Sequence, residues 1–346
     1  HLGDNYPLRA VDQGFQVALV HKGGGLGQPS DPAGSAGYFN PILMANGHEQ
    51  RYEGYCSDIY TNAALEFIQS VTKGPFFVYL AFNAPHSPLE VPAKDLDAYK
   101  NVDLSFDAFP KIGNKLPGQA DIDKTARVYA MVSNIDTNVG RILALLESQK
   151  LAENTIVIFM TDNGPASFRF NAGMRGYKGT VYEGGIRVPC YIRWPNRLKA
   201  GRVVEPIAAH IDLLPTLVEA AGLKLPKDLK IDGRSLLPLL LGQAGVDWPD
   251  RALFFQWHRG DVPELGRAFA LRTQRYKLVS PEPIPKPNEP NPKLPEPELY
   301  DLDTDPYENH NIADRQRELV AILLDTYRSW FRNVSATRGF APPRIQ

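Results

Sequence analysis

The sequence predicts an α/β fold in which a mostly parallel central sheet is flanked by helices, followed by a small C-terminal antiparallel α+β subdomain. Two continuous apolar runs, residues 75–82 and 155–160, are typical of strands buried on both faces of a parallel sheet. Between them, apolar residues recur at helical spacing from Asp121 to about Ser148. After about residue 245, short strand-like segments follow one another with few helices between them, which indicates an antiparallel sheet.

The first domain is expected to span residues 1–245. A helix is predicted over 57–71, where apolar residues recur at helical spacing and Ser57 is the expected N-cap. Three further elements are expected there: short strands at 15–20 and 190–194, and a helix at 212–221. Strands alternating with helices are typical of a mostly parallel sheet that is covered by helices.

The second domain is expected to span residues 246–346. Its predicted elements are short strands at 253–256, 268–271, 276–279 and 298–300, and a closing helix from about 315 to 331. Between the last two strands, residues 281–297 contain eight prolines, which favours an extended loop over a packed element.

Composition excludes several classes of function. The 38 lysines and arginines nearly balance the 39 aspartates and glutamates, giving a net charge of −1, so binding to nucleic acid through bulk charge is not expected. No apolar run approaches the roughly 20 residues of a membrane span, and no span is expected. The two cysteines, Cys56 and Cys190, are too few for a disulfide framework or a cysteine-rich zinc site.

Polar residues follow the second apolar run at Asp162-Asn163-Gly164. Ligands in open α/β sheets gather at the carboxyl ends of strands, and side-chain oxygens of Asp and Asn suit calcium or magnesium. The same triplet is also a common turn sequence, so a metal site and a simple turn both remain open on this evidence.

A histidine, His86, follows the first apolar run and is enclosed by Pro85 and Pro88. Histidine at the end of a strand is suited to act as a general acid or base near neutral pH. The alternative is a loop histidine that is hydrogen-bonded to the backbone.

A glycine-rich segment from Arg175 to Pro189 contains Lys178 between Gly176-Tyr177 and Gly179. Glycines allow close approach of the backbone to a ligand, and a lysine there suits an oxyanion such as sulfate or phosphate. The alternative is a solvated basic loop, which is the usual environment of lysine.

Taken together, these segments resemble the arylsulfatase-type sulfatases of the alkaline phosphatase superfamily. Five blocks carry the resemblance over essentially the whole chain: His1-Leu2-Gly3, Pro85-His86-Ser87-Pro88, Thr161-Asp162-Asn163-Gly164, the loop from Gly176-Tyr177-Lys178-Gly179 to Arg187-Val188-Pro189, and Glu298-Leu299-Tyr300-Asp301-Leu302 with Asp305-Pro306. The resemblance implies the alkaline phosphatase-like sulfatase fold and hydrolysis of an aryl or carbohydrate sulfate ester.

The resemblance also implies a role for each matched residue. Asp162 and Asn163 would bind Ca²⁺, or Mg²⁺ as in some members, and Lys178 would hold the sulfate. His86 would contact the substrate and protonate the leaving alcohol, and His1 would help to eliminate sulfate from the covalent intermediate. The family nucleophile is a formylglycine made from a C/S-x-P-x-R motif. Family members are usually exported or lysosomal, so an exported protein is expected.

The sequence departs from the family pattern at the nucleophile. Neither Cys56 nor Cys190 begins a C/S-x-P-x-R motif, and no serine does. The expectation is a sulfatase lacking its N-terminal segment, with the formylglycine upstream of His1 and this chain inactive alone. Two alternatives remain: a phosphodiesterase, phosphonate hydrolase or phosphoethanolamine transferase of the same superfamily, and a non-catalytic protein that binds sulfated ligands.

Overall fold

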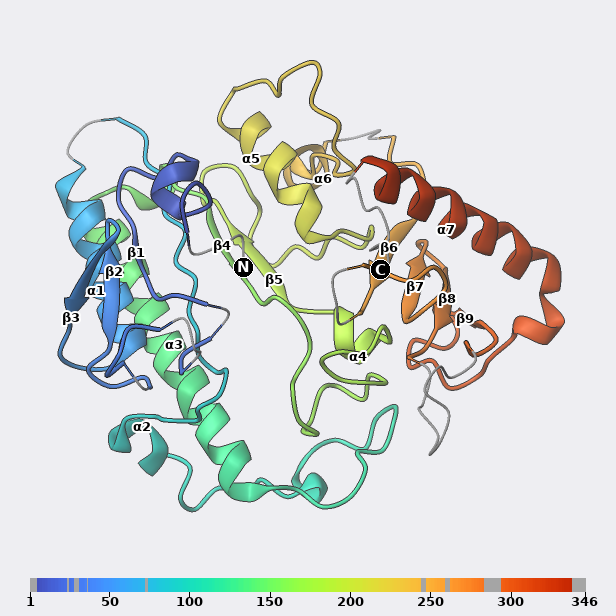
Figure 1. Cartoon of the computed structure of the whole chain (residues 1–346), viewed down its shortest axis with the longest axis horizontal. Helices are drawn as coiled ribbons and strands as arrows, with labels where there is room; N and C mark the ends of the chain where they lie inside the picture. Colours follow the sequence, from blue (N-terminus) through green and yellow to red (C-terminus); the bar gives the residue numbers. More distant parts are fainter. Residues whose placement is uncertain are drawn as a thin grey trace, which may run out of the picture. The chain divides into compact units, whose positions relative to one another are not determined.

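The computed structural model describes residues 5–23, 25–27, 31–35, 37–71, 74–243, 247–258, 262–282 and 294–337 (Figure 1). The chain forms two compact units, the first made of His1–Phe109 with Gln119–Thr155 and the second of Pro110–Gly118 with Ile156–Gln346. In the part of the chain that is described, no helix is both long and apolar enough to cross a membrane. The domain boundary predicted near residue 245 stays a prediction.

The first unit packs two long helices beside a small antiparallel sheet. Its elements are β1 (Leu19–Val20), β2 (Ile42–Ala45), β3 (His48–Arg51), α1 (Cys56–Ser70), α2 (Ala93–Asp97) and α3 (Ile122–Ser148), with short 3₁₀ turns at Ala10–Gln13, Phe106–Ala108 and Ala152–Asn154. Its core joins Met131 and Ile135 of α3 to Ile59 of α1 and to Tyr38, all buried. The apolar stripe that predicts α3 therefore forms the centre of this unit.

The boundaries of the two helices follow from their caps. The side chain of Asp121 accepts a hydrogen bond of 3.0 Å from the backbone of Lys124, which satisfies an exposed amide at the start of α3. Helix α1 starts earlier than expected. Its N-cap is Tyr55, whose side chain makes no capping hydrogen bond, and Ser57 lies buried in its first turn. The predicted helix is confirmed, and the predicted cap is wrong.

The second unit contains two antiparallel sheets. Its elements are β4 (Val157–Met160), α4 (Glu183–Ile186), β5 (Cys190–Arg193), α5 (Leu213–Ala220), α6 (Leu237–Leu241), β6 (Leu253–Gln256), β7 (Phe269–Arg272), β8 (Tyr276–Ser280), β9 (Glu298–Asp301) and α7 (Arg317–Thr337), with 3₁₀ turns at His210–Asp212 and Ala313–Arg315. Strands β6 to β9 pair with their neighbours in chain order. This confirms the predicted C-terminal antiparallel sheet and its closing helix. Most of the proline-rich segment lies outside the described residues.

The expectation of a mostly parallel central sheet is not met by the described strands. Every ladder among them is antiparallel, including that of β4 with β5. Residues 75–82 form no described ladder and expose alternate side chains, with Phe77 59% and Tyr79 73% accessible. An apolar run shows that a segment is suited to burial, but the run does not encode which strand lies beside it.

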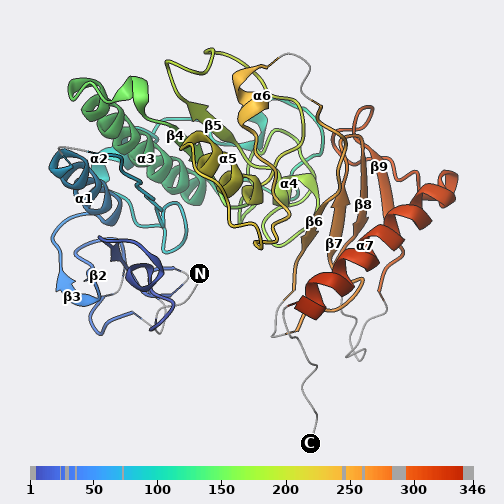
Figure 2. The same ribbon diagram turned by 90° about the horizontal axis from the view of Figure 1, so that it is seen from above.

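The four-stranded sheet of the second unit has two differently used faces. Residues Phe269, Leu271, Leu278 and Leu299 pack against Leu323 and Tyr327 of α7, which lies across the sheet (Figure 2). Their neighbours Ala270, Val279 and Tyr300 point the other way and pack against Val181 and Tyr182. Alternation along each strand thus places a helix on one face and the glycine-rich segment on the other.

We expect Tyr327→Ala to lower the free energy of unfolding by about 3–5 kcal/mol, as for large aromatic truncations in a core. Tyr327 is fully buried, and its ring stacks on Phe269 with a centroid distance of 3.6 Å. Ile322→Ala, on the exposed side of the same helix, is the control and should change the free energy of unfolding by no more than about 0.5 kcal/mol. Urea unfolding measures both; equal effects would contradict the assigned core.

Candidate anion- and metal-binding site

The segment after β4 carries the predicted metal ligands. Asp162 is exposed and Asn163 is half-buried. The backbone of Asn163 donates to Asp162 Oδ1 over 2.8 Å, and Asn163 Nδ2 donates to the carbonyl of Gly164 over 2.9 Å. The ring Nε2 of His210 donates to the Thr161 carbonyl over 3.0 Å and so supports the start of this loop. The triplet can therefore form a turn and still offer oxygen ligands to a metal ion.

Glycine allows this loop to pack directly on the glycine-rich segment. The amide of Gly164 donates to the carbonyl of Gly185 over 3.0 Å, and a Cβ on Gly164 would overlap the carbonyl of Gly184. A Cβ on Gly184 would in turn come within 2.6 Å of the carbonyl of Arg175. Backbone lies against backbone here, so no side chain can replace these glycines without displacing the loops.

Lys178 lies at the tip of a β-turn. The amide of Thr180 donates to the Tyr177 carbonyl over 2.9 Å, and Gly179 adopts φ +85°, which the third residue of a type II turn requires. The amide of Lys178 donates to the carbonyl of Pro165 over 2.9 Å. Among the described residues, the half-buried Lys178 ammonium forms no ion pair. The structure thus holds the lysine turn directly against the loop of Asp162 and Asn163.

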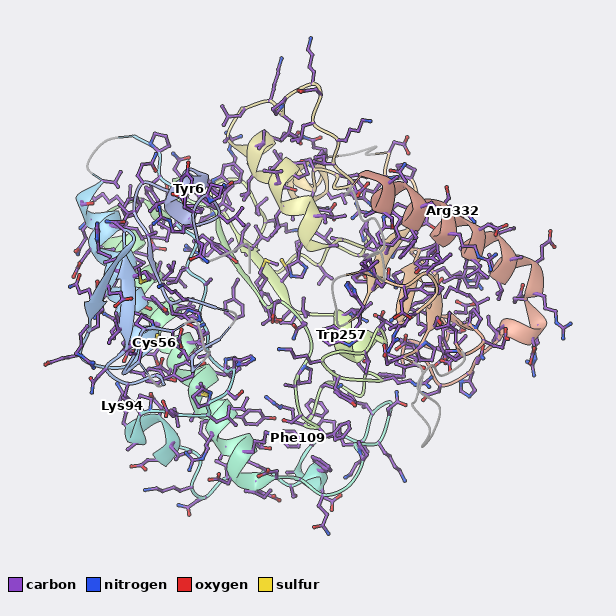
Figure 3. The ribbon with its side chains drawn as sticks, viewed as in Figure 1. Tyr6, Cys56, Lys94, Phe109, Trp257 and Arg332 are labelled. Carbon is purple, nitrogen blue, oxygen red and sulfur yellow. The ribbon has the colours of Figure 1, made fainter. Side chains whose placement is uncertain are left out.

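Aromatic side chains surround the lysine turn. The exposed rings of Phe168 and Tyr177 meet edge to face, with centroids 4.9 Å apart. A Cβ on Gly179 would lie 3.5 Å from the ring of Trp257, which also packs with the cluster around Tyr182 near α4 (Figure 3). The turn is therefore supported on one side by Trp257 and presents an apolar pair beside Lys178.

His86 belongs to the first unit, where the backbone fixes it. Its amide donates to the Asn83 carbonyl over 2.9 Å, and its carbonyl accepts from the buried Tyr38 hydroxyl over 2.8 Å. The imidazole is exposed, and its Nδ1 lies 2.8 Å from the Ser87 carbonyl. Because a carbonyl only accepts, Nδ1 carries the hydrogen of this contact. His1 lies outside the described residues, and convergence of either histidine with Lys178 stays a prediction.

Sequence reasoning missed a buried charged cluster next to this site. Lys277 Nζ lies 2.9 Å from Glu183 Oε1 and 2.8 Å from Glu308 Oε1. Burial raises the pKa of Glu183, but Lys277, Arg272 and Arg187 together outweigh it, so the pKa is lowered overall. Burial raises the pKa of Glu308, and Lys277 offsets this only in part. The sequence carried no signal for the cluster, because its members are separated by up to 125 residues.

Asp162 and Asn163 carry oxygen atoms of the kind that a metal site needs. They offer the carboxylate and amide oxygens that calcium and magnesium prefer, but calcium takes roughly six to eight oxygens. In the described ranges, no group of three or more His, Cys, Asp or Glu side chains could hold a metal ion. The pair therefore fits such an ion only as a member of a larger ligand set.

Comparison with known proteins defines the class. The sulfatase family matches residues 9–223, more than half of the chain, so the chain belongs to the sulfatase family. Residues 176–326 match the C-terminal part of N-sulphoglucosamine sulphohydrolase. N-acetylglucosamine-6-O-sulfatase of Bacteroides thetaiotaomicron is 32% identical to this chain, in an alignment that covers 95% of this chain and 73% of that protein.

Solved structures share the fold. The crystal structure of Ps i-CgsB in complex with k-i-k-neocarrahexaose has a TM-score of 0.73 at 25% identity, covering 95% of this chain and 69% of that one. A phosphonate monoester hydrolase from Silicibacter pomeroyi has a TM-score of 0.59 at 24% identity, covering 80% and 59%, a likeness that shows the fold alone. Three curated relatives are 36%, 35% and 31% identical to this chain. The chain covers only 35%, 38% and 48% of their respective lengths.

We expect Gly164→Ala to lower the free energy of unfolding by about 1–3 kcal/mol, because the new methyl group would displace the backbone of Gly184. Gly140→Ala in α3 is the control: its methyl group would meet no atom of another segment within 4 Å, and helix propensity should raise stability by up to about 1 kcal/mol. Urea unfolding of both variants distinguishes the two. A neutral Gly164→Ala would mean that the loops do not require direct backbone contact.

Proposed function

We propose that the protein is a sulfuric ester hydrolase and that the Asp162–Pro165 loop and the Lys178 turn bind the sulfate group. The observation that carries this proposal is the hydrogen bond from the Lys178 amide to the Pro165 carbonyl. It holds the turn that carries Lys178, whose ammonium has no described ion partner, against the loop with the candidate metal ligands. Membership of the sulfatase family supports the assignment.

The proposed mechanism gives each residue of this chain one task. Lys178 stabilises negative charge on the non-bridging sulfate oxygens as the ester bond breaks. In its doubly protonated form, His86 gives the Nε2 proton to the leaving alcohol oxygen and becomes the neutral ring, while the hydrogen on Nδ1 stays bonded to the Ser87 carbonyl and holds the ring in orientation. Asp162 and Asn163 contribute oxygen ligands to a calcium or magnesium ion, which would supply further positive charge at the sulfate.

The nucleophile is proposed to be a formylglycine supplied by polypeptide outside the 346 residues. Two observations support this: the sequence contains no C/S-x-P-x-R motif, and the chain covers less than half of several curated relatives. On this proposal, the chain alone binds sulfate and does not turn over an ester. His1 as an aid to sulfate release, and export from the cytoplasm, stay predictions.

Two alternatives have observations of their own. A phosphonate monoester hydrolase shares the fold, but an Asp-Asn pair with a single lysine favours sulfate over sites that use additional Asp and His ligands. The absence of a C/S-x-P-x-R motif from these residues is also expected of a protein that binds sulfated ligands without cleaving them.

The group that carries the sulfate is proposed to be a sugar ring. Phe168 and Tyr177 expose their rings beside Lys178, and aromatic faces stack readily on the apolar faces of rings. Some relatives support this class, since one is named as an N-acetylglucosamine-6-O-sulfatase. An aryl ring could occupy the same surface, so the experiment compares both.

In the full-length protein with its nucleophile installed and calcium present, Lys178→Ala should lower kcat/KM on 4-nitrophenyl sulfate or N-acetylglucosamine 6-sulfate by about a hundredfold or more. Lys199→Ala, which removes an exposed lysine of the same unit, is the control and should leave both rates unchanged. Turnover of phosphonate esters alone would favour the phosphonate hydrolase, and tight binding of sulfated sugar without turnover would favour the binder.

Tyr177→Ala should raise KM for N-acetylglucosamine 6-sulfate by about two- to tenfold through loss of ring stacking. Tyr177→Phe keeps the ring and should retain the KM. Inhibition by inorganic sulfate, which lacks a ring, should stay the same in both variants. A larger effect on 4-nitrophenyl sulfate than on the sugar sulfate would assign the surface to aryl substrates instead.

A further inference from the structure

Three buried charged side chains contact one another next to the segment that carries Lys178. Lys277 of β8 and Glu308 are fully buried, and Glu183, the first residue of α4, is nearly so. Lys277 Nζ lies between the two carboxylates at 2.9 and 2.8 Å. The contact with Glu183 is a hydrogen bond, and the contact with Glu308 is an ion pair. We call these three residues the buried triad.

The buried triad binds the C-terminal end of the segment that contains Lys178, residues 175–183. Glu308 Oε2 accepts a hydrogen bond of 2.7 Å from the backbone amide of Glu183, at the first turn of α4. Arg272 of β7 adds a second cation, with its Nε 3.9 Å from Glu183 Oε1. The chain is therefore fixed at residue 183 through both its backbone and its side chain.

The other end of the same segment is held by the same part of the sheet. Arg175 donates to the Tyr300 hydroxyl over 2.6 Å and to the Glu308 carbonyl over 2.9 Å. Its guanidinium also lies 4.0 Å from the centre of the Tyr182 ring. Glu308 thus contacts both ends of the 175–183 segment, and Lys178 lies on the turn between them.

Stability alone is a poor explanation for this arrangement. Removing charges from water is costly, and replacing a buried ion pair by apolar groups is often neutral or stabilising. What charged groups provide is directional attachment, since each oxygen and hydrogen must be satisfied in one geometry. Here that geometry connects β8 and the turn at Glu308 to the segment that presents Lys178.

We propose that Lys277, Glu183 and Glu308 are positioning residues for Lys178, through which the C-terminal sheet fixes the turn that binds sulfate. The identity of the ligand rests on the proposed function, whereas the positioning of the turn does not. Another buried ion pair of the same unit, Asp212 with Arg251, offers a comparison. It holds the residue before α5 and makes no described contact with the 175–183 segment.

The test uses this chain and a neutral replacement of the buried triad, Lys277→Met with Glu183→Gln and Glu308→Gln, which removes all three buried charges together and leaves the partly exposed Arg272 without its carboxylate partner. Glu308→Gln alone is the conservative variant, because it keeps an acceptor for one of its two partners. Arg251→Met with Asp212→Asn is the matched control. Two quantities are measured on folded protein: amide hydrogen exchange over residues 175–185, and the Kd for inorganic sulfate.

In the neutral triad variant, we expect exchange at the Lys178 amide to become about tenfold faster or more, because its hydrogen bond to Pro165 is then held less firmly. Sulfate binding should weaken by about tenfold, with a smaller change in Glu308→Gln. The Asp212 and Arg251 control reaches this region indirectly, through His210 and the Thr161 carbonyl, so it should change each quantity by less than about twofold.

Unchanged exchange in a folded triad variant would overturn the proposal, and so would an equal change in the control. If the triad variant does not fold, Glu308→Gln decides by the same exchange measurement. Should unmodified chain fail to bind sulfate, the proposed function would be contradicted, while the exchange data would still decide the positioning role.

Discussion

Direct contact between two backbones is the constraint on which the candidate site depends. A Cβ on Gly164 would overlap the Gly184 carbonyl, and the Gly164 amide bonds to the Gly185 carbonyl. The loop after β4 and the glycine-rich segment are consequently one assembly rather than two independent loops. A lysine on one and a carboxylate on the other can therefore keep a fixed relation without touching each other.

Elements whose signal is local could be predicted from sequence. Helix α3 is predicted by its apolar stripe, and β6 to β9 are predicted by short apolar segments between turns. Residues 75–82 show the limit, because their apolar character says nothing about which strand pairs with them. Likewise, helical spacing located α1 but gave no reason to choose Tyr55 over Ser57 as its cap.

The candidate site divides along the same line. The triplet at Asp162 and the glycines around Lys178 are contiguous motifs, so the sequence identified them. The link between them, from the Lys178 amide to the Pro165 carbonyl, involves only backbone atoms and leaves no trace in residue type. The charged cluster around Lys277 was missed for another reason: lysine and glutamate are usually solvated, and nothing local marks these as buried.

The uncovered apolar side chains of residues 75–82 affect how this polypeptide behaves in solution. Phe77 and Tyr79 project from a segment whose backbone is not paired in any described ladder. Such a segment is a template for strand addition from a neighbouring molecule, and proteins normally protect it with charge, proline or a covering element. Self-association through this segment would increase with protein concentration, so dilute solution suits its purification.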